Sequence, residues 1–175
     1  MVNIIFDIET TGLFDSLFER VLSICTHNTD NGEIKTFTGE DEQKILTDFF
    51  SYLSSLEDPI LFGFNSESFD LPFIVRRAVV YKKRIPNFGS VDLRKKANGY
   101  AYSRNASTKG TLRDWANVFN IPIQTDAGSE MFKLYKDKRF GEIERHCLED
   151  IKVTTKLYEH IKETGILEWG KWYPN

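Results

Sequence analysis

Two acidic side chains, Asp7 and Glu9, follow a short apolar run near the start of the chain, in the segment NIIFDIETTG (residues 3–12). If this run is a strand, residues two apart point to the same face, so both carboxylates lie on one side and Ile8 on the other. Two such carboxylates repel each other unless a cation lies between them. Acids at a frayed strand end could instead face water, but the apolar residues before Asp7 favour a buried strand and a cation-binding pair.

A third acid, Asp70, lies in the segment GFNSESFDLP, which starts at Gly63. It follows the end of an apolar strand pattern and opens a helical one. An acid in the first helical turn can simply complement the helix dipole, and Asn65 can be an ordinary loop residue. Taken alone, this segment therefore does not distinguish a metal ligand from an acid that stabilises the start of a helix.

A fourth acid, Asp150, lies inside a long helical pattern near the end of the chain. Residues four apart in a helix share a face, so His146 is expected to lie on the same side as Asp150. A histidine has a pKa near neutrality and can act as a general base. The alternative is a solvated patch in which Glu149 and Asp150 pair with Lys152 or Arg145.

Strand and helix patterns surround these acids in an order typical of an α/β protein. Nearly continuous or alternating apolar residues predict strands at 2–8, 20–29, 33–39 and 59–65. Apolar residues at helical spacing predict helices at 41–56, 68–84, 111–120, 129–137 and 139–165. The polar stretch 99–110 predicts a loop. We therefore expect a single α/β domain over residues 1–175, with a central mixed β-sheet flanked by α-helices.

Composition sets broad limits on the function. The 175 residues are 41% hydrophobic with a net charge of −3, so the chain has no global basic signature of a nucleic-acid binder, although a local patch or bound cations could serve instead. No apolar run approaches the length of a membrane span, and the N-terminal run is too short for a signal peptide. Cys25 and Cys147 lack metal-ligand spacing. We expect a cytoplasmic or nuclear protein with no membrane partner.

The three acidic segments together resemble the motifs of the DEDD superfamily of 3'-5' exonucleases, which have the ribonuclease-H-like fold. FDIETTG is similar to the first motif of that family. FNSESFDLP is similar to the second motif in the form found in the proofreading domain of family-B DNA polymerases. HCLEDIKVTTKLYEH resembles the third motif of the stand-alone DEDDy-type exonucleases of the bacterial and archaeal ribonuclease-H-like group. The resemblance covers residues 2 to about 169 and implies the ribonuclease-H-like α/β fold.

The resemblance implies hydrolysis of phosphodiester bonds at the 3' ends of single-stranded DNA or RNA. It implies that two divalent cations, Mg²⁺ or Mn²⁺, are held by four acids: Asp7, Glu9, Asp70 and Asp150. Two such cations generate the nucleophile, neutralise the phosphoryl charge and assist the leaving oxygen. The implied partners are single-stranded 3' ends and a polymerase or a complex for repair or nucleic-acid processing.

The third motif departs from the family pattern at one position. The tyrosine branch of the family has a tyrosine four residues before the last acid, and the histidine branch has a histidine five residues before it. Here His146 stands at the tyrosine spacing, and Arg145, which cannot act as a base, stands at the histidine spacing. His146 therefore orients the attacking water, acts as a general base from a different turn, or only packs on the helix face.

The resemblance also implies residues that contact the substrate. They are Thr10, Thr11, Gly12, Leu13, Asn65 and Phe69. Leu13 and Phe69 can equally be core residues, since a wedge or a stacking ring is apolar in either role. The basic residues Arg94, Lys95, Lys96, Arg104 and Lys109 are candidates for contacts with the nucleic-acid backbone, or form a solvated charged loop.

Two other functions fit the same motifs. A catalytically silent nucleic-acid-binding module on the same fold would usually have lost some of the acids, and all four are present. A ribonuclease-H-like endonuclease would keep the acids but cut within a strand. Products from labelled linear and circular strands distinguish these alternatives.

Overall fold

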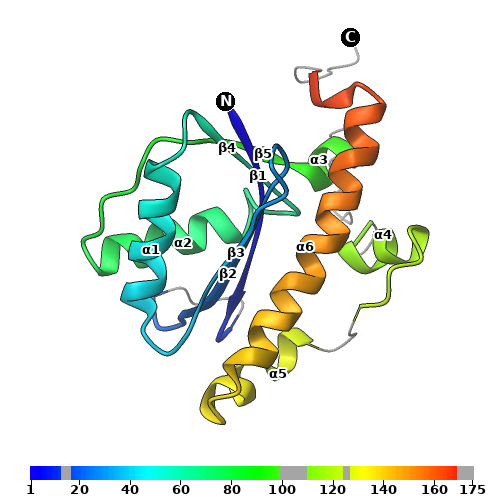
Figure 1. Cartoon of the computed structure of the whole chain (residues 1–175). Coiled ribbons are helices and arrows are strands. Elements are labelled where there is room, and N and C mark those ends of the chain that lie inside the picture. The colour runs from blue at the N-terminus through cyan, green and yellow to red at the C-terminus, as the bar shows by residue number, and fades with distance from the viewer. Residues whose placement is uncertain (13–16, 99–109, 124–126, 169–175) are drawn as a thin grey trace.

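A five-stranded mixed β-sheet forms the centre of the structure, a computed structural model that describes residues 1–12, 17–98, 110–123 and 127–168 (Figure 1). Its strand order is β3-β2-β1-β4-β5. β1 pairs antiparallel with β2, and β2 pairs antiparallel with β3, whereas β1, β4 and β5 run parallel. The strands are β1 (Val2–Thr10), β2 (Val21–Asn28), β3 (Ile34–Thr38), β4 (Pro59–Gly63) and β5 (Gly89–Asp92).

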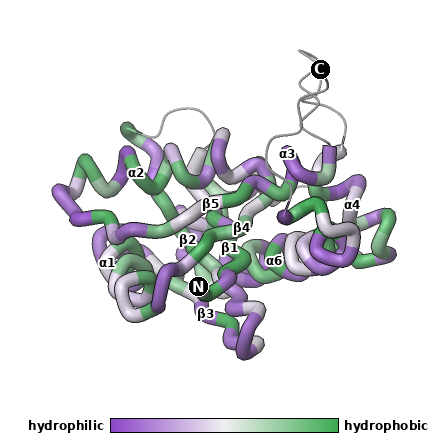
Figure 2. Tube along the Cα trace, turned by 90° about the horizontal axis from the view of Figure 1, so that it is seen from above, coloured by the Kyte–Doolittle hydropathy of each residue, from purple (hydrophilic) through white to green (hydrophobic). Residues whose placement is uncertain are grey.

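Helices cover both faces of the sheet. α1 and α2 lie on one face, and the long helix α6 crosses the other with α3, α4 and α5 beside it (Figures 1 and 2). Figure 2 shows the strands between these two helical layers. The described helices are α1 (Glu42–Ser54), α2 (Asp70–Val80), α3 (Leu93–Ala97), α4 (Leu112–Val118), α5 (Ala127–Lys136), α6 (Phe140–Glu163) and the short 3-10 helix η2 (Ile166–Glu168).

The alternation of side chains along β1 divides the core into two. Ile4, Phe6 and Ile8 pack with residues of α1 and α2 in one hydrophobic cluster. Ile5 packs with residues of α6 in the other cluster. Because strand side chains alternate, Asp7 shares the α6 face with Ile5. The central strand thus presents acids to α6 while its other face completes the core.

Local capping explains where two of the helices begin. The Asp41 side chain accepts a hydrogen bond from the Lys44 amide and caps α1. Thr111 and Asp114 form a reciprocal capping box at the start of α4. The long helix α6 buries Ile143, Cys147, Ile151, Thr154, Leu157 and Ile161, which is the stripe that its periodicity indicates.

The predicted hairpin, the strand at 59–65 and all five predicted helices are present, with ends that differ by a few residues. The sequence pattern missed β5 and α3. β5 has four residues, of which one is a valine and one a glycine, so it shows no alternation. Residues 99–109 of the predicted loop lie outside the described residues. Among the helices that the structure describes, none is both long and apolar enough to cross a bilayer.

Candidate metal centre and nucleic-acid site

Three carboxylates converge between β1 and α6. Asp7 and Glu9 point to the same side of β1, and Asp150 comes from α6. Each contributes one oxygen to a group whose members all lie within 4.8 Å of one another. Glu9 is only 9% exposed. A single cluster thus contains two acids of β1 and one acid of α6, which follows Glu9 by 141 residues.

Asp70 approaches the same cluster from the other helical layer. It is the first residue of α2 and is 4% exposed. It lines one pocket together with the three clustered acids. The backbone amide of Ile8 donates a hydrogen bond to its carboxylate, which ties the start of α2 to β1 beside Asp7. Asp70 therefore borders the carboxylate cluster but is not one of its three mutually adjacent members.

Burial and the charges of neighbouring acids raise the pKa values of all four acids. Burial, and then the charges of Asp150 and the other acids, hold the pKa of Asp7 well above its usual range. Burial and the charge of Asp150 do the same for the pKa of Glu9. Burial raises the pKa of Asp70 to about 7, although backbone hydrogen bonds oppose it, and burial with the charge of Glu149 raises the pKa of Asp150 to about 6.

This chemistry fits divalent cations. A cluster of buried carboxylates without a compensating positive charge is unfavourable, and oxygen ligands of this kind are those that Mg²⁺ and Mn²⁺ prefer. Asp7, Glu9 and Asp150 are placed to hold such a cation directly. Asp70 lines the same pocket at the edge of this group.

We expect the burial of these acids and the repulsion between them to make the stability of the metal-free protein depend on pH. A raised folded pKa means that a carboxyl group contributes stability below its unfolded pKa, near 4, and loses that contribution as the pH rises through the folded value. For Asp70 the loss falls between pH 4 and about 7. In chelator at pH 8, Asp70→Asn should therefore raise the melting temperature by about 5 °C or more, with little change at pH 4.

Thermal unfolding from pH 4 to 8, followed by circular dichroism, measures this effect. Asp48→Asn on the exposed surface of α1 is the matched control and should give no such pH-dependent gain. Equal melting temperatures of wild type and Asp70→Asn at pH 8 would show that Asp70 is not held at a raised pKa.

His146 is buried on α6, one turn before Asp150, and is 6% exposed. It belongs neither to the three-carboxylate group nor to the residues that line the acid-lined pocket in the described part of the chain. The predicted shared helix face is present, and the catalytic role of His146 stays a prediction.

The turn after β1 is held by its own side chains. Thr10 Oγ1 donates to the Gly12 carbonyl at 2.7 Å, and the Thr11 hydroxyl donates to Glu19. A Cβ at Gly12 would lie 2.7 Å from the end of the Glu19 side chain, which could move to accommodate it. Leu13 lies outside the described residues.

Asn65, Phe69 and Arg94 line the acid-lined pocket beside the carboxylates. Arg94 Nη1 donates to Asn65 Oδ1 at 3.3 Å, and the Arg94 guanidinium lies over the Phe64 ring at 5.8 Å. Phe69 also packs on the core, with 5.6 Å between its ring centroid and that of Phe73. The core packing predicted for the ring is present, and stacking of Phe69 on a base stays a prediction.

The predicted basic stretch divides into residues with different surroundings. Arg94 lines the pocket. Lys95 forms an ion pair with Glu67, and Lys96 is 7% exposed, with its Nζ 3.4 Å from the Ile166 carbonyl. The prediction that Lys96 contacts nucleic acid is therefore wrong, because its ammonium group points into the protein. Arg104 and Lys109 lie outside the described residues.

Two residues beside the site were missed by sequence reasoning. Asp92 is 3% exposed, and its Oδ1 accepts from the Asn65 amide at 3.0 Å, so it orients the turn that carries Asn65. Cys147 Sγ lies 3.4 Å from the Asp7 carbonyl and 3.7 Å from Asp7 Oδ2. Both cysteines are fully buried. Cys147 lies three residues before Asp150, so the helical period alone places it near the acids.

Comparisons with known proteins agree with this geometry. The model of the RNase H superfamily matches residues 4–162. Among 211 matching chains of solved structures, the family B DNA polymerase from the hyperthermophilic archaeon Pyrobaculum calidifontis has a TM-score of 0.77 and 20% sequence identity. The match covers 95% of this chain and 25% of the polymerase, so this chain spans about a quarter of that protein. No curated protein sequence gave a significant match. The family model spans most of the chain, and this protein belongs to the RNase H superfamily.

Proposed function

We propose that this protein is a metal-dependent 3'-5' exonuclease that releases nucleotides from the 3' ends of single-stranded DNA or RNA. The observation that carries the proposal is the convergence of four acids from β1, α2 and α6 on one pocket. Membership of the RNase H superfamily supports a nuclease-type function. The polarity and the preference for single strands rest on the resemblance of the motifs to DEDD exonucleases.

Each acid has a distinct place in the proposed site. Asp7, Glu9 and Asp150 would hold the cation that activates water, and Asp70 would support a second cation beside them. When bound, Mg²⁺ or Mn²⁺ lowers the pKa of a water ligand and neutralises charge on the phosphoryl oxygens. The turn at residues 10–12 and Asn65 bind the terminal nucleotide.

His146 is proposed to orient the attacking water or to accept its proton. His146→Gln keeps hydrogen-bonding capacity but cannot titrate near neutrality, so the two roles differ in pH dependence. If His146 is a general base, the alkaline plateau in the plot of kcat against pH should be lost in His146→Gln. An orienting role predicts that the profile keeps its shape and that His146→Ala is slower than His146→Gln. Equal activity of all three proteins would leave His146 with a packing role.

Arg94 is proposed to bind a phosphate near the scissile bond. We expect Arg94→Ala to raise KM for a single-stranded oligonucleotide about tenfold with little change in kcat, and to lower the salt slope of binding by about 0.7, because one phosphate contact is lost. Lys95→Ala is the neighbouring control, since Lys95 forms an ion pair with Glu67. Fluorescence anisotropy at several salt concentrations measures the slope, and an unchanged slope in Arg94→Ala contradicts the role.

The function itself is tested with 5'-labelled single-stranded DNA and RNA in Mg²⁺ or Mn²⁺. An exonuclease of the proposed polarity gives a ladder of products that shortens from the 3' end, and it leaves circular strands intact. Internal cuts, or cleavage of circles, would indicate an endonuclease. Binding without products in either metal would indicate a silent binding module. Parallel DNA and RNA substrates then show which nucleic acid is preferred. A preference for DNA would favour a partner in DNA synthesis or repair, and a preference for RNA would favour a partner in RNA processing.

A further inference from the structure

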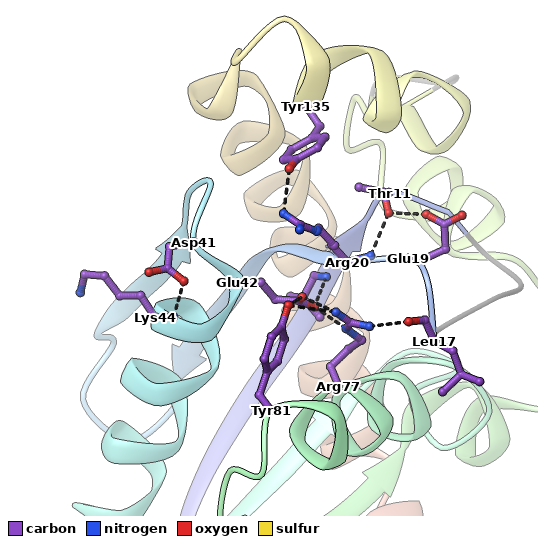
Figure 3. Close-up of polar contacts among 11 residues, drawn as sticks. Thr11, Leu17, Glu19, Arg20, Asp41, Glu42, Lys44, Arg77, Tyr81 and Tyr135 are labelled. Carbon is purple, nitrogen blue, oxygen red and sulfur yellow. Dashed lines mark hydrogen bonds and ion pairs between the residues drawn. The ribbon is translucent and has the colours of Figure 1, made fainter.

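A buried ion pair lies behind the turn that follows β1. Glu42 of α1 and Arg77 of α2 are 3% and 4% exposed. Arg77 Nε donates to Glu42 Oε1 at 2.7 Å, and Arg77 Nη2 donates to Glu42 Oε2 at 2.6 Å. Tyr81 donates to Glu42 Oε2 at 2.7 Å (Figure 3). The two charges therefore form a bidentate pair with a third polar group beside it.

Both partners also bind the main chain of the segment that leads into β2. Arg77 Nη1 donates to the Leu17 carbonyl at 2.9 Å, and the Val21 amide donates to Glu42 Oε1 at 2.8 Å. Figure 3 shows the Arg77 guanidinium between Glu42 on one side and the Leu17 carbonyl on the other. A salt bridge in a core can often be replaced by apolar side chains without loss of stability. Apolar side chains could not, however, form the two hydrogen bonds that Glu42 and Arg77 make with the main chain.

The segment at residues 17–20 has little apolar burial of its own. The side chains of Leu17 and Phe18 are 61% and 82% exposed. The segment is instead paired with the turn after β1: the Thr11 amide donates to the Arg20 carbonyl at 2.9 Å, and the Arg20 amide donates to Thr11 Oγ1 at 2.8 Å. Thr11 is thus tied to the segment, and the segment is tied to Glu42 and Arg77, while the Arg20 side chain also donates to the Tyr135 hydroxyl at 3.0 Å.

We propose that Glu42 and Arg77 are positioning residues that fix the turn at residues 10–12 for binding of a nucleic-acid 3' end. This inference rests on the proposed function, in which that turn contacts the terminal nucleotide. Asp70 and Arg77 belong to the same helix, so α2 connects one acid of the metal centre with the support of the turn.

The test is the double variant Glu42→Leu/Arg77→Met, which replaces the pair by apolar side chains of similar size. We expect kcat/KM for a single-stranded oligonucleotide to fall about 10- to 100-fold, because a displaced binding turn misaligns the terminal nucleotide. Mn²⁺ affinity should stay within about twofold of wild type, because the four acids are untouched. Lys44→Gln/Asp48→Asn removes an exposed ion pair of the same charges from α1 and should leave all readouts unchanged.

Hydrogen exchange supplies a readout that does not need activity. The amides of Thr11 and Arg20 should exchange at least tenfold faster in the double variant, while core amides of β1 stay protected. Wild-type exchange at these amides, or kcat/KM within twofold of wild type, would overturn the inference. If the double variant does not fold, Arg77→Lys takes its place. A single ammonium group cannot keep both the bidentate contact with Glu42 and the hydrogen bond to the Leu17 carbonyl.

Failure of the proposed function can be distinguished from failure of this inference. A wild-type protein that degrades no strand would refute the hydrolytic activity. In that case the dissociation constant for a 3'-ended strand decides the inference, with an increase of at least tenfold in the double variant supporting the positioning role. An unchanged dissociation constant would overturn it.

Discussion

Asp7→Asn should degrade single-stranded oligonucleotides at least about 10³-fold more slowly than wild type, because the loss of a shared carboxylate ligand removes several kcal/mol of charge stabilisation from the transition state. Asp7 belongs to the three-carboxylate group with Glu9 and Asp150, and it lines the same pocket as Asp70. Single-turnover kinetics with a labelled strand, in saturating Mn²⁺, measure the loss.

The loss of activity should not reflect unfolding. Asparagine is nearly isosteric with aspartate and carries no charge, so it removes both the burial of a charge and the repulsion that raise the pKa of Asp7 in the metal-free protein. We expect Asp7→Asn to melt at or above the wild-type temperature in chelator at pH 8. Asp48→Asn is the surface control and should keep full activity. Activity of Asp7→Asn within tenfold of wild type would mean that the metal centre has been misassigned.

Breaking the buried ion pair on one side should give the largest loss of stability. We expect Arg77→Met to lower the free energy of unfolding by about 3–5 kcal/mol, because the Glu42 carboxylate then stays buried without its cation. Glu42 is 3% exposed, so water compensates little. Urea unfolding followed by tryptophan fluorescence measures the change.

The double variant Glu42→Leu/Arg77→Met should recover most of that stability, since both charges are then gone. The two single variants and the double variant form a thermodynamic cycle that isolates the coupling between the side chains. A loss below about 1 kcal/mol in Arg77→Met, which is typical of an exposed pair such as Lys44 with Asp48, would contradict the burial of this charge.

The positions of Asp7 and Glu9 could be predicted from the sequence because a strand has a period of two. The apolar residues before Asp7 indicated burial, and the period placed both acids on one face. The helical period likewise placed His146 and Asp150 on one face of α6. Asp70 required the family motif, since an acid at a helix start is otherwise unremarkable in the sequence.

The network behind the turn could not be predicted from periodicity. Glu42 in the first turn of α1 looks like a dipole-stabilising acid, and 35 residues separate it from Arg77. One signal was present: Arg77 follows Phe73 by four residues and thus falls on the buried face of α2. A charged residue on such a face requires a partner, but the sequence alone does not name it. Asp92 was missed with the short strand that carries it.

The alternation along β1 limits how this chain can change during evolution. Insertion of one residue in β1 before Asp7 would move the side chains on one side of the insertion to the opposite face of the sheet. Acids and apolar residues would then exchange places between the two helical layers. A substitution in β1 changes one position on one face, whereas a change in its length disrupts the core and the metal centre together. Natural variants of this protein should therefore conserve the spacing of this strand and tolerate length changes in the hairpin turn at residues 29–33, outside the paired strands.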